Sequence, residues 1–255
     1  MIRLKTKEDI QILREGGKRH AQILKELAAM VKPGLKVQEL EDKARELIEA
    51  GGDKAAFLNY QPYGADRPYP AALCVSINDE VVHGIPNETE KILKEGDIVS
   101  LDLGLIHKQM ITDAAITVAV GKISPELEEL LVHTKAALLA GIKAAKGGKK
   151  IGDISNAIQL VGQAHKYGIV EELSGHGVGY DVHEDPYVPN YGEPGKGIAL
   201  KPGMVIAIEP MFNMGTRKVF LGTDGYTYKT DDGKPSAHFE HTVLITKGDA
   251  EILTA

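Results

Sequence analysis

Several features are scarce or missing in this 255-residue chain, which contains no tryptophan and one cysteine. Because Cys74 has no partner within the chain, an internal disulfide and a zinc site built on several cysteines are excluded, which fits a reducing compartment. No stretch approaches the ~18 consecutive apolar residues of a membrane span, and the first residues contain no apolar signal-peptide core. We therefore expect a cytoplasmic protein without a membrane partner.

Positive charge is not in excess either. The chain has 30 Lys and Arg against 36 Asp and Glu, which gives a formal net charge of −6 and a pI near 5.9. Nucleic-acid-binding modules usually carry a basic surface, so neither a nucleic-acid partner nor an acidic substrate is favoured. With 43% hydrophobic and 26% charged residues, the chain can bury a sizeable core.

Helix signals occur in two similar blocks. The first block predicts a helix capped by Thr6 that ends at Pro33-Gly34, followed by a helix over 37–50. The second predicts a helix from Ser124 to about Ala145 and, after a glycine-rich break, a helix to about Tyr167.

The two blocks also align directly. A shift of 114 residues superposes VKPGLKVQEL (31–40) on AKGGKKIGDI (145–154), which indicates an internal duplication. We therefore expect an α+β fold of two related halves, with a site where their strands meet. The main predicted strands are 71–78 and 80–84, which form a hairpin, then 98–104, 111–120, 204–210 and 237–246.

Two of these strands each carry an aspartate where the apolar pattern predicts a buried position. IVSLDLG (98–104) contains Asp102, and ITDAAITVAV (111–120) contains Asp113. The segment between them is short enough for a hairpin-like return, which would bring the two aspartates close together. A buried carboxylate is costly unless a positive group meets it, and neither strand contains Lys or Arg. One or two divalent cations are therefore the simplest partners that could neutralise the two aspartates.

Three more residues extend this ligand set. Glu209 ends the apolar run VIAI, Glu240 lies between Phe239 and His241 in an apolar strand, and His176 lies between two glycines. Four carboxylates carry about four negative charges, which two divalent ions would balance. An oxygen-rich set with one imidazole suits Mn, Fe(II) or Co, with Zn as a further candidate, better than a closed structural zinc site.

Each of these residues also has an ordinary interpretation. A strand carboxylate near a sheet end is usually solvated or caps a loop, and a histidine between glycines is more often a loop residue than a ligand. The coincidence of four carboxylates favours the metal site. Because a two-metal site binds a bridging water and lowers its pKa, we predict hydrolysis. His83 and His183 are the candidates to polarise the substrate carbonyl and to stabilise the leaving group.

The chain contains a series of motifs that, in this order and spacing, resemble those of type I methionine aminopeptidases: NDEVVHGIP, IVSLDLG, ITDA, SGHGVG, VHEDP, AIEP and HFEHT. The resemblance covers nearly the whole chain. It implies the pita-bread fold, a pseudo-symmetric α+β domain with a central antiparallel sheet flanked by helices, here one catalytic domain over residues 1–255.

The resemblance also implies an activity and its partners. The enzyme would remove the initiator methionine from nascent polypeptides when the second residue is small, by attack of a metal-bridged water or hydroxide on the first peptide bond. The expected partner is the N-terminus of a nascent or short polypeptide. Transient ribosome contact would be allowed, although no docking segment precedes the first helix, and we expect a monomer.

The resemblance further assigns roles to the site residues. Asp113 and Glu240 would bridge the two metals, and Glu209 would also accept the proton of the attacking water. His83 would hydrogen-bond the scissile amide or its leaving nitrogen, and His183 would stabilise the carbonyl oxygen as charge develops. The implied metal ligands are Asp102, Asp113, His176, Glu209 and Glu240.

The implied methionine pocket is apolar and aromatic. This chain has Val182 where the family often has an aromatic residue and Tyr226 where it often has Trp, and the stretch QPYGADRP (61–68) is longer than in close relatives. For each aromatic residue, plain core packing is the alternative interpretation. The implied pocket residues are Phe57, Tyr60, Tyr69, Cys74, His83, Val182, His183 and Tyr226.

Features of the sequence argue against three related classes of protein. Xaa-Pro peptidases share the five ligands but usually carry a substantial domain before the first helix, which begins here near residue 7. Type II methionine aminopeptidases carry a large insertion between the second histidine and the metal glutamate, whereas only 26 positions separate His183 from Glu209. A non-catalytic relative that binds ribosome or RNA would be expected to lose ligands, and all five are present.

Overall fold

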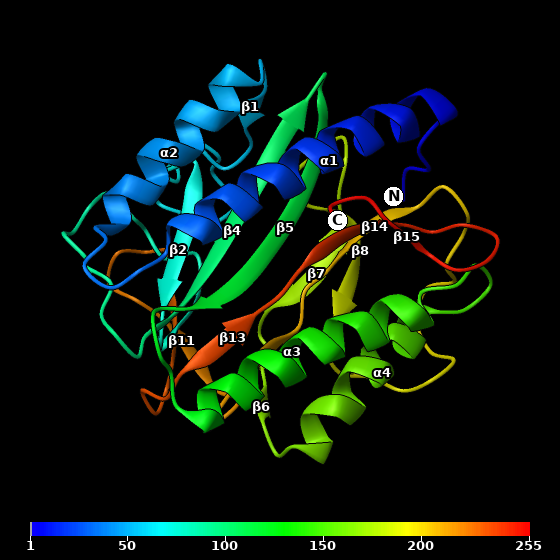
Figure 1. The fold of residues 1–255 in the computed structure, drawn as a ribbon. Coiled ribbons are helices and arrows are strands. Elements are labelled where there is room, and N and C mark those ends of the chain that lie inside the picture. The colour runs from blue at the N-terminus through cyan, green and yellow to red at the C-terminus, as the bar shows by residue number, and fades with distance from the viewer. Residues whose placement is uncertain (1) are drawn as a thin grey trace.

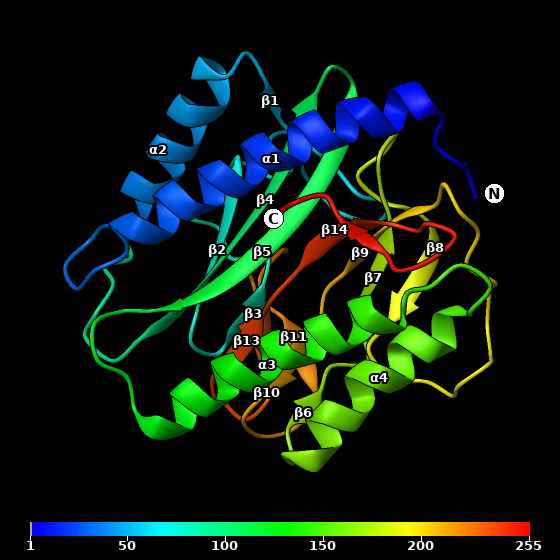
Figure 2. The same ribbon diagram turned by 45° about the vertical axis from the view of Figure 1, so that its right-hand side comes forward.

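The computed structural model of the chain describes residues 2–255. Its helices lie in two pairs that cover antiparallel sheets (Figures 1 and 2). Helices α1 (Lys7–Met30) and α2 (Val37–Ala50) belong to the first half, and α3 (Pro125–Ala144) and α4 (Ile151–Ala164) belong to the second. No helix within the described range is both long and apolar enough to cross a membrane.

The helix boundaries follow from capping chemistry. The Thr6 hydroxyl accepts the Asp9 backbone N–H, and the Asp9 carboxylate accepts the Thr6 N–H, so α1 begins as predicted. The Ser124 hydroxyl caps α3 by accepting the backbone N–H of Leu127 at 3.4 Å. Helix α4 ends earlier than predicted, because Lys166 adopts a left-handed backbone with a φ of 60°.

The two halves repeat each other at the break between their helices. Gly34 and Gly148, which are 114 positions apart, both have a φ of 85°. Their backbone N–H groups donate to the carbonyls of Leu93 and Leu200 at 2.8 and 3.0 Å. Helices α2 and α4 each contain 14 residues and also start 114 positions apart. The structure therefore contains the duplication that the sequence indicates.

The first half is built on a four-stranded sheet in which β4 (Ile98–His107) pairs with the three other strands. Strands β4 and β5 form a long hairpin that turns at Lys108 and Gln109, both with positive φ, so β4 extends beyond the predicted 98–104. The other strands are β1 (Lys54–Ala55), β2 (Leu73–Ile77) and β5 (Met110–Ala119).

The second half contains a five-stranded sheet in the order β15-β14-β9-β7-β8 and a three-stranded sheet in the order β13-β10-β6. A further sheet, β11-β12-β3, joins strand β3 of the first half to the second half. The bounds are β3 (Glu80–Val82), β6 (Gly168–Ile169), β7 (Ser174–Gly177), β8 (Glu184–Pro189), β9 (Val205–Ile208), β10 (Met211–Asn213), β11 (Val219–Leu221), β12 (Tyr228–Thr230), β13 (Ser236–His238), β14 (His241–Leu244) and β15 (Glu251–Ile252).

Two predicted strand features differ from the structure. The chain turns near Asn78-Asp79 as expected, but β2 pairs with β4 and β3 pairs with β12 instead of with each other. The predicted strand 237–246 is interrupted between β13 and β14. The interruption contains Glu240, whose backbone N–H donates to the Ala115 carbonyl of β5 at 2.9 Å. This contact joins Glu240 to the first half.

Separate apolar clusters support the strands of each half. In the first half, Leu27 of α1 and Leu40 of α2 are fully buried in one cluster with Leu103 of β4. In the second half, Ile158 of α4 is fully buried in another cluster with Ile208 of β9. Burial of this apolar surface supplies most of the favourable free energy of folding.

A buried carboxylate joins α2 to the start of β2. Glu41 accepts the backbone N–H groups of Ala72 and Leu73 at 2.8–3.1 Å, and the Nε of Arg45 donates to it at 2.5 Å. Because the Glu41 side chain is fully buried, these contacts are shielded from water. They fix the end of the long connection between β1 and β2.

We expect Glu41→Ala to lower the free energy of unfolding by about 2–4 kcal/mol, because two buried backbone N–H groups lose their acceptor. The matched control is Glu46→Ala on the same helix, which removes an exposed ion pair with Lys43 and should change stability by less than about 0.5 kcal/mol. Urea unfolding measures both variants. Equal, small effects would show that the Glu41 contacts contribute little.

Candidate active site

Nearly all of the predicted site residues line one cavity of about 260 Å³. Val182 is the exception, because it is packed in a core cluster with Leu13 and Met110 and does not line the cavity. The predicted residues on the cavity wall are Phe57, Tyr60, Tyr69, Cys74, His83, Asp102, Asp113, His176, His183, Glu209, Tyr226 and Glu240. The wall also includes residues that the sequence did not indicate: Pro62, Val82, Glu172, Leu173, Ser174 and Tyr187.

The four carboxylates reach the cavity from both halves. In the β4–β5 ladder, Asp102 is opposite Ala115 and Asp113 is opposite Gly104, so the two aspartates are diagonal neighbours. Glu209 follows the end of β9, and Glu240 lies in the interruption between β13 and β14. Carboxylates at strand interruptions can turn into a cavity without breaking a regular ladder.

The orientation of His176 leaves one ring nitrogen with a lone pair that can bind a metal ion. Its Nδ1 donates to the Gly177 carbonyl at 2.9 Å, so Nε2 carries the lone pair. Nε2 lies 3.4 Å from Glu209 Oε1 and 3.9 Å from Asp113 Oδ2. Burial, and then the neighbouring His183, lowers the pKa of His176 to about 3, so the imidazole is neutral at pH 7. A neutral imidazole is the form that binds metals.

The carboxylates resist ionisation in the absence of a cation. Burial raises the pKa of Asp102 to about 7. Burial and then the neighbouring carboxylates raise the pKa values of Asp113, Glu209 and Glu240 well above their usual range. Such shifts arise where several negative charges share a space without a positive partner.

These groups fit divalent cations. Ligand atoms of Asp113, His176 and Glu240 all lie within 4.8 Å of one another. Asp102 Oδ1, Asp113 Oδ1 and Glu240 Oε1 are buried and have no hydrogen-bond partner among the described residues. Buried polar atoms without partners are rare and require an explanation, which a bound ion provides here.

Two side chains that the sequence did not indicate hold the backbone of these ligands. The Thr242 hydroxyl accepts the Asp113 N–H at 2.8 Å and donates to the Asp113 carbonyl at 2.7 Å. The Asn190 amide donates to the Glu209 carbonyl at 3.0 Å. No local motif marks either residue, because each acts across a distance of many residues in the sequence.

His238 is a further buried residue that the sequence analysis missed. Its Nε2 lies 3.7 Å from Glu209 Oε2, and neither ring nitrogen has a hydrogen-bond partner within residues 2–255. Burial lowers its pKa to about 3. Its position two residues before Glu240, in a predicted apolar strand, was the available signal.

Two more imidazoles, those of His83 and His183, lie on the same cavity wall as the carboxylates. The His183 ring lies 4.4 Å from the His176 ring, and its Nδ1 is 2.9 Å from the Tyr60 hydroxyl. Burial lowers the pKa of His183, and burial followed by the proximity of His183 lowers the pKa of His83 to about 4. Both are therefore neutral at pH 7 and can donate a hydrogen bond without carrying charge.

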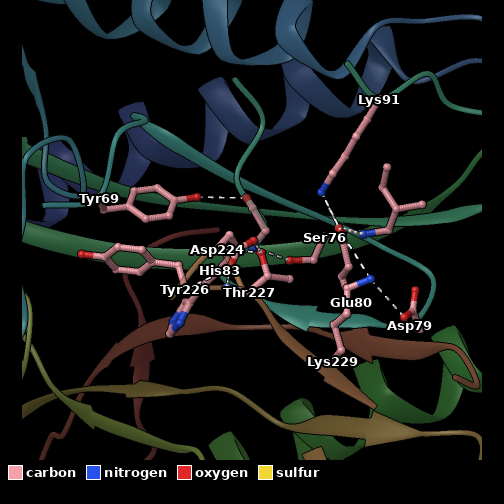
Figure 3. A network of polar contacts seen from close by, with 12 residues as sticks. Tyr69, Ser76, Asp79, Glu80, His83, Lys91, Asp224, Tyr226, Thr227 and Lys229 are labelled. Atoms are coloured by element: carbon pink, nitrogen blue, oxygen red, sulfur yellow. Dashed lines mark hydrogen bonds and ion pairs between the residues drawn. The ribbon is translucent and has the colours of Figure 1, made fainter. Parts of the chain in front are cut away.

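Aromatic rings form the apolar wall of the cavity. The rings of Tyr69 and Tyr226 meet edge to face with centroids 5.1 Å apart, and Figure 3 shows both beside His83. The Tyr226 hydroxyl donates to the Arg67 carbonyl, and the Arg67 guanidinium pairs with Glu88. These contacts tie the 61–68 segment to the cavity wall.

The chain matches the model of metallopeptidase family M24 over residues 11–247. It is 48% identical over 257 residues to a methionine aminopeptidase of Aquifex aeolicus, covering 99% of this chain and 98% of the relative. It is 43% identical over 254 residues to methionine aminopeptidase 1 of Bacillus subtilis, covering 100% of this chain and 99% of the relative.

Solved structures show the same relationship. A methionine aminopeptidase from Thermotoga maritima superposes with a TM-score of 0.94 at 42% identity, covering 100% of this chain and 99% of that one. A prolidase from Pyrococcus furiosus shares the fold, with a TM-score of 0.75 at 24% identity over 99% of this chain and 65% of the prolidase. The chain therefore belongs to metallopeptidase family M24, with its pita-bread fold, and groups within it with the type I methionine aminopeptidases.

Proposed function

We propose that the enzyme removes methionine from the N-terminus of polypeptides whose second residue is small, with the help of two divalent cations. The observation that carries the proposal is the convergence of three buried carboxylates, the partly buried carboxylate of Glu209 and one neutral imidazole at an apolar, aromatic-walled cavity. The family resemblance extends it to a single domain over residues 1–255 that acts as a cytoplasmic monomer on nascent chains, in transient contact with the ribosome.

The cation ligands in this proposal are Asp102, Asp113, His176, Glu209 and Glu240. Two divalent cations would balance the charge of four ionised carboxylates, whereas one would leave the site negative. When bound, they lower the pKa of water and polarise a carbonyl. The oxygen-rich donor set favours Mn, Fe(II) or Co, with Zn as a further candidate.

The protein side chains supply proton transfer and hydrogen bonds. Glu209 accepts the proton of the attacking water, because its carboxylate lies on the cavity wall beside His176. The Tyr60 hydroxyl lies 2.9 Å from His183 Nδ1, and in the tautomer that accepts from Tyr60, His183 Nε2 carries the hydrogen that stabilises the developing oxyanion. His83 hydrogen-bonds the scissile amide or its leaving nitrogen.

The apolar wall selects the first side chain of the substrate. Phe57, Tyr69, Cys74 and Tyr226 offer aromatic and sulfur surfaces, which favour a flexible thioether over a charged group. The limit on the size of the second residue follows from the family resemblance.

The first test measures release of free methionine from Met-Ala-Ser by metal-stripped protein, with and without added Mn, Fe(II) or Co. Gly-Pro serves as the control substrate. We expect metal-dependent cleavage of Met-Ala-Ser alone. Cleavage of Gly-Pro alone would assign the enzyme to the Xaa-Pro peptidases, and inactivity on both in folded, metal-loaded protein would contradict the proposal.

Replacing the bridging carboxylate should separate activity from folding. We expect Asp113→Asn to lower methionine release more than about 100-fold, because one shared ligand is lost.

Burial raises the pKa of Asp113 in the folded protein, so the folded state loses stability as pH rises from about 4, the unfolded value. Metal-free wild type should therefore melt at a lower temperature at pH 8 than at pH 5.5.

The variant should show a smaller decrease in melting temperature over the same pH range, because it has one ionisable group fewer. Thermal unfolding in the presence of a chelator measures this difference. An active, metal-replete Asp113→Asn protein would contradict the assignment of the bridging ligand.

The role of His83 is tested by a variant that suits its backbone. His83 has a φ of 59°, a conformation that asparagine tolerates, so His83→Asn removes the imidazole with little added strain. We expect turnover to fall about 100-fold or more while the bound metal per chain, measured by elemental analysis, stays unchanged. Loss of metal in proportion to activity would show that His83 is a ligand.

A further inference from the structure

The backbone at His83 needs support. Its φ of 59° lies in the left-handed region, which a residue with a side chain rarely adopts. Such a conformation persists when the surrounding structure holds it in place, and it often occurs at functional sites. The contacts that hold this turn are made by the next residue, Gly84.

Every polar backbone group of Gly84 is hydrogen-bonded. Its N–H donates to the Ser76 hydroxyl at 3.0 Å, and its carbonyl accepts the Val75 N–H at 2.8 Å and the Tyr69 hydroxyl at 2.9 Å. A Cβ at this position would lie 2.2 Å from the Val75 carbonyl oxygen, so only glycine fits. The turn is thus pressed against β2.

Thr227 lies beside His83 but contributes little to holding the backbone turn there. Its hydroxyl lies 2.6 Å from Asp224 Oδ2 and 3.4 Å from the His83 carbonyl. A hydroxyl has one proton, and the short contact to a carboxylate takes it. The side chains that hold the turn are therefore those of Ser76 and Tyr69.

We propose that Ser76 and Tyr69 are positioning residues for His83, and that Tyr69 couples occupancy of the side-chain pocket to the placement of this imidazole. The inference rests on the proposed function. The Tyr69 ring forms part of the cavity wall, and its hydroxyl holds the turn that carries His83. A first side chain that packs on this ring supports the same hydrogen bond that holds Gly84. Selection of the substrate then acts on kcat as well as on KM.

The first experiment compares Ser76→Ala with Ser100→Ala in metal-loaded protein. Ser100 is the matched control because it is buried directly opposite Ser76 on β4, but its hydroxyl contacts Thr117 and not the turn. We expect Ser76→Ala to lower kcat about tenfold with KM within about twofold, and Ser100→Ala to leave both nearly unchanged. Equal kcat values in the two variants would overturn the role of Ser76.

The second experiment compares Tyr69→Phe with Tyr226→Phe, which each remove one hydroxyl from the pocket wall. Tyr69→Phe should lower kcat about tenfold, whereas Tyr226→Phe, whose partner is the Arg67 carbonyl, should act mainly by raising KM. An unchanged kcat in Tyr69→Phe, or a change confined to KM, would overturn the proposal. This pair also tests the proposal if Ser76→Ala does not fold.

Coupling is measured by replacing methionine with alanine as the first residue of the substrate. The resulting loss of kcat should be several-fold smaller in Tyr69→Phe than in wild type, because the link to His83 is already broken. Equal losses would overturn the coupling. Failure of the proposed function is distinguishable, since wild type would then release no methionine, whereas failure of this inference leaves wild type active.

Discussion

The mutual repulsion of four carboxylates in a largely buried cavity is the constraint on which the site depends. Asp102 and Asp113 come from one hairpin, and Glu209 and Glu240 come from strand ends of the other half. Without a cation, burial and crowding raise their pKa values, so folding around them requires protons or metal. Burial of the apolar clusters in the two halves supplies the free energy that offsets the cost of bringing these carboxylates together.

The sequence was sufficient to predict the helices, the Thr6 and Ser124 caps, the duplication and many of the residues that line the cavity, although not Val182, which lies in the core instead. These predictions relied on local chemistry, such as the Thr6–Asp9 cap, or on carboxylates in apolar strands. The partners of β2 and β3 were not predictable, because pairing is decided by contacts far along the chain. The same holds for Thr242 and His238, which reach the site only through tertiary packing.

The duplication explains why the cavity lies between the halves. Each half closes its own helix break with equivalent hydrogen bonds, from Gly34 in the first and Gly148 in the second. Neither half contains the complete ligand set, since His176, Glu209 and Glu240 belong to the second. A cation that contacts both sets would act as a cross-link, and each tenfold excess over its dissociation constant would add about 1.4 kcal/mol to stability.

Cys74, the single cysteine, lies on the cavity wall next to these groups. Burial, and then the nearby Asp102, raises the pKa of its thiol well above the usual range. The thiolate is the form that reacts with peroxide and with alkylating reagents. The fold therefore keeps a sulfur atom on the cavity wall in its protonated form, the form that reacts more slowly with such reagents.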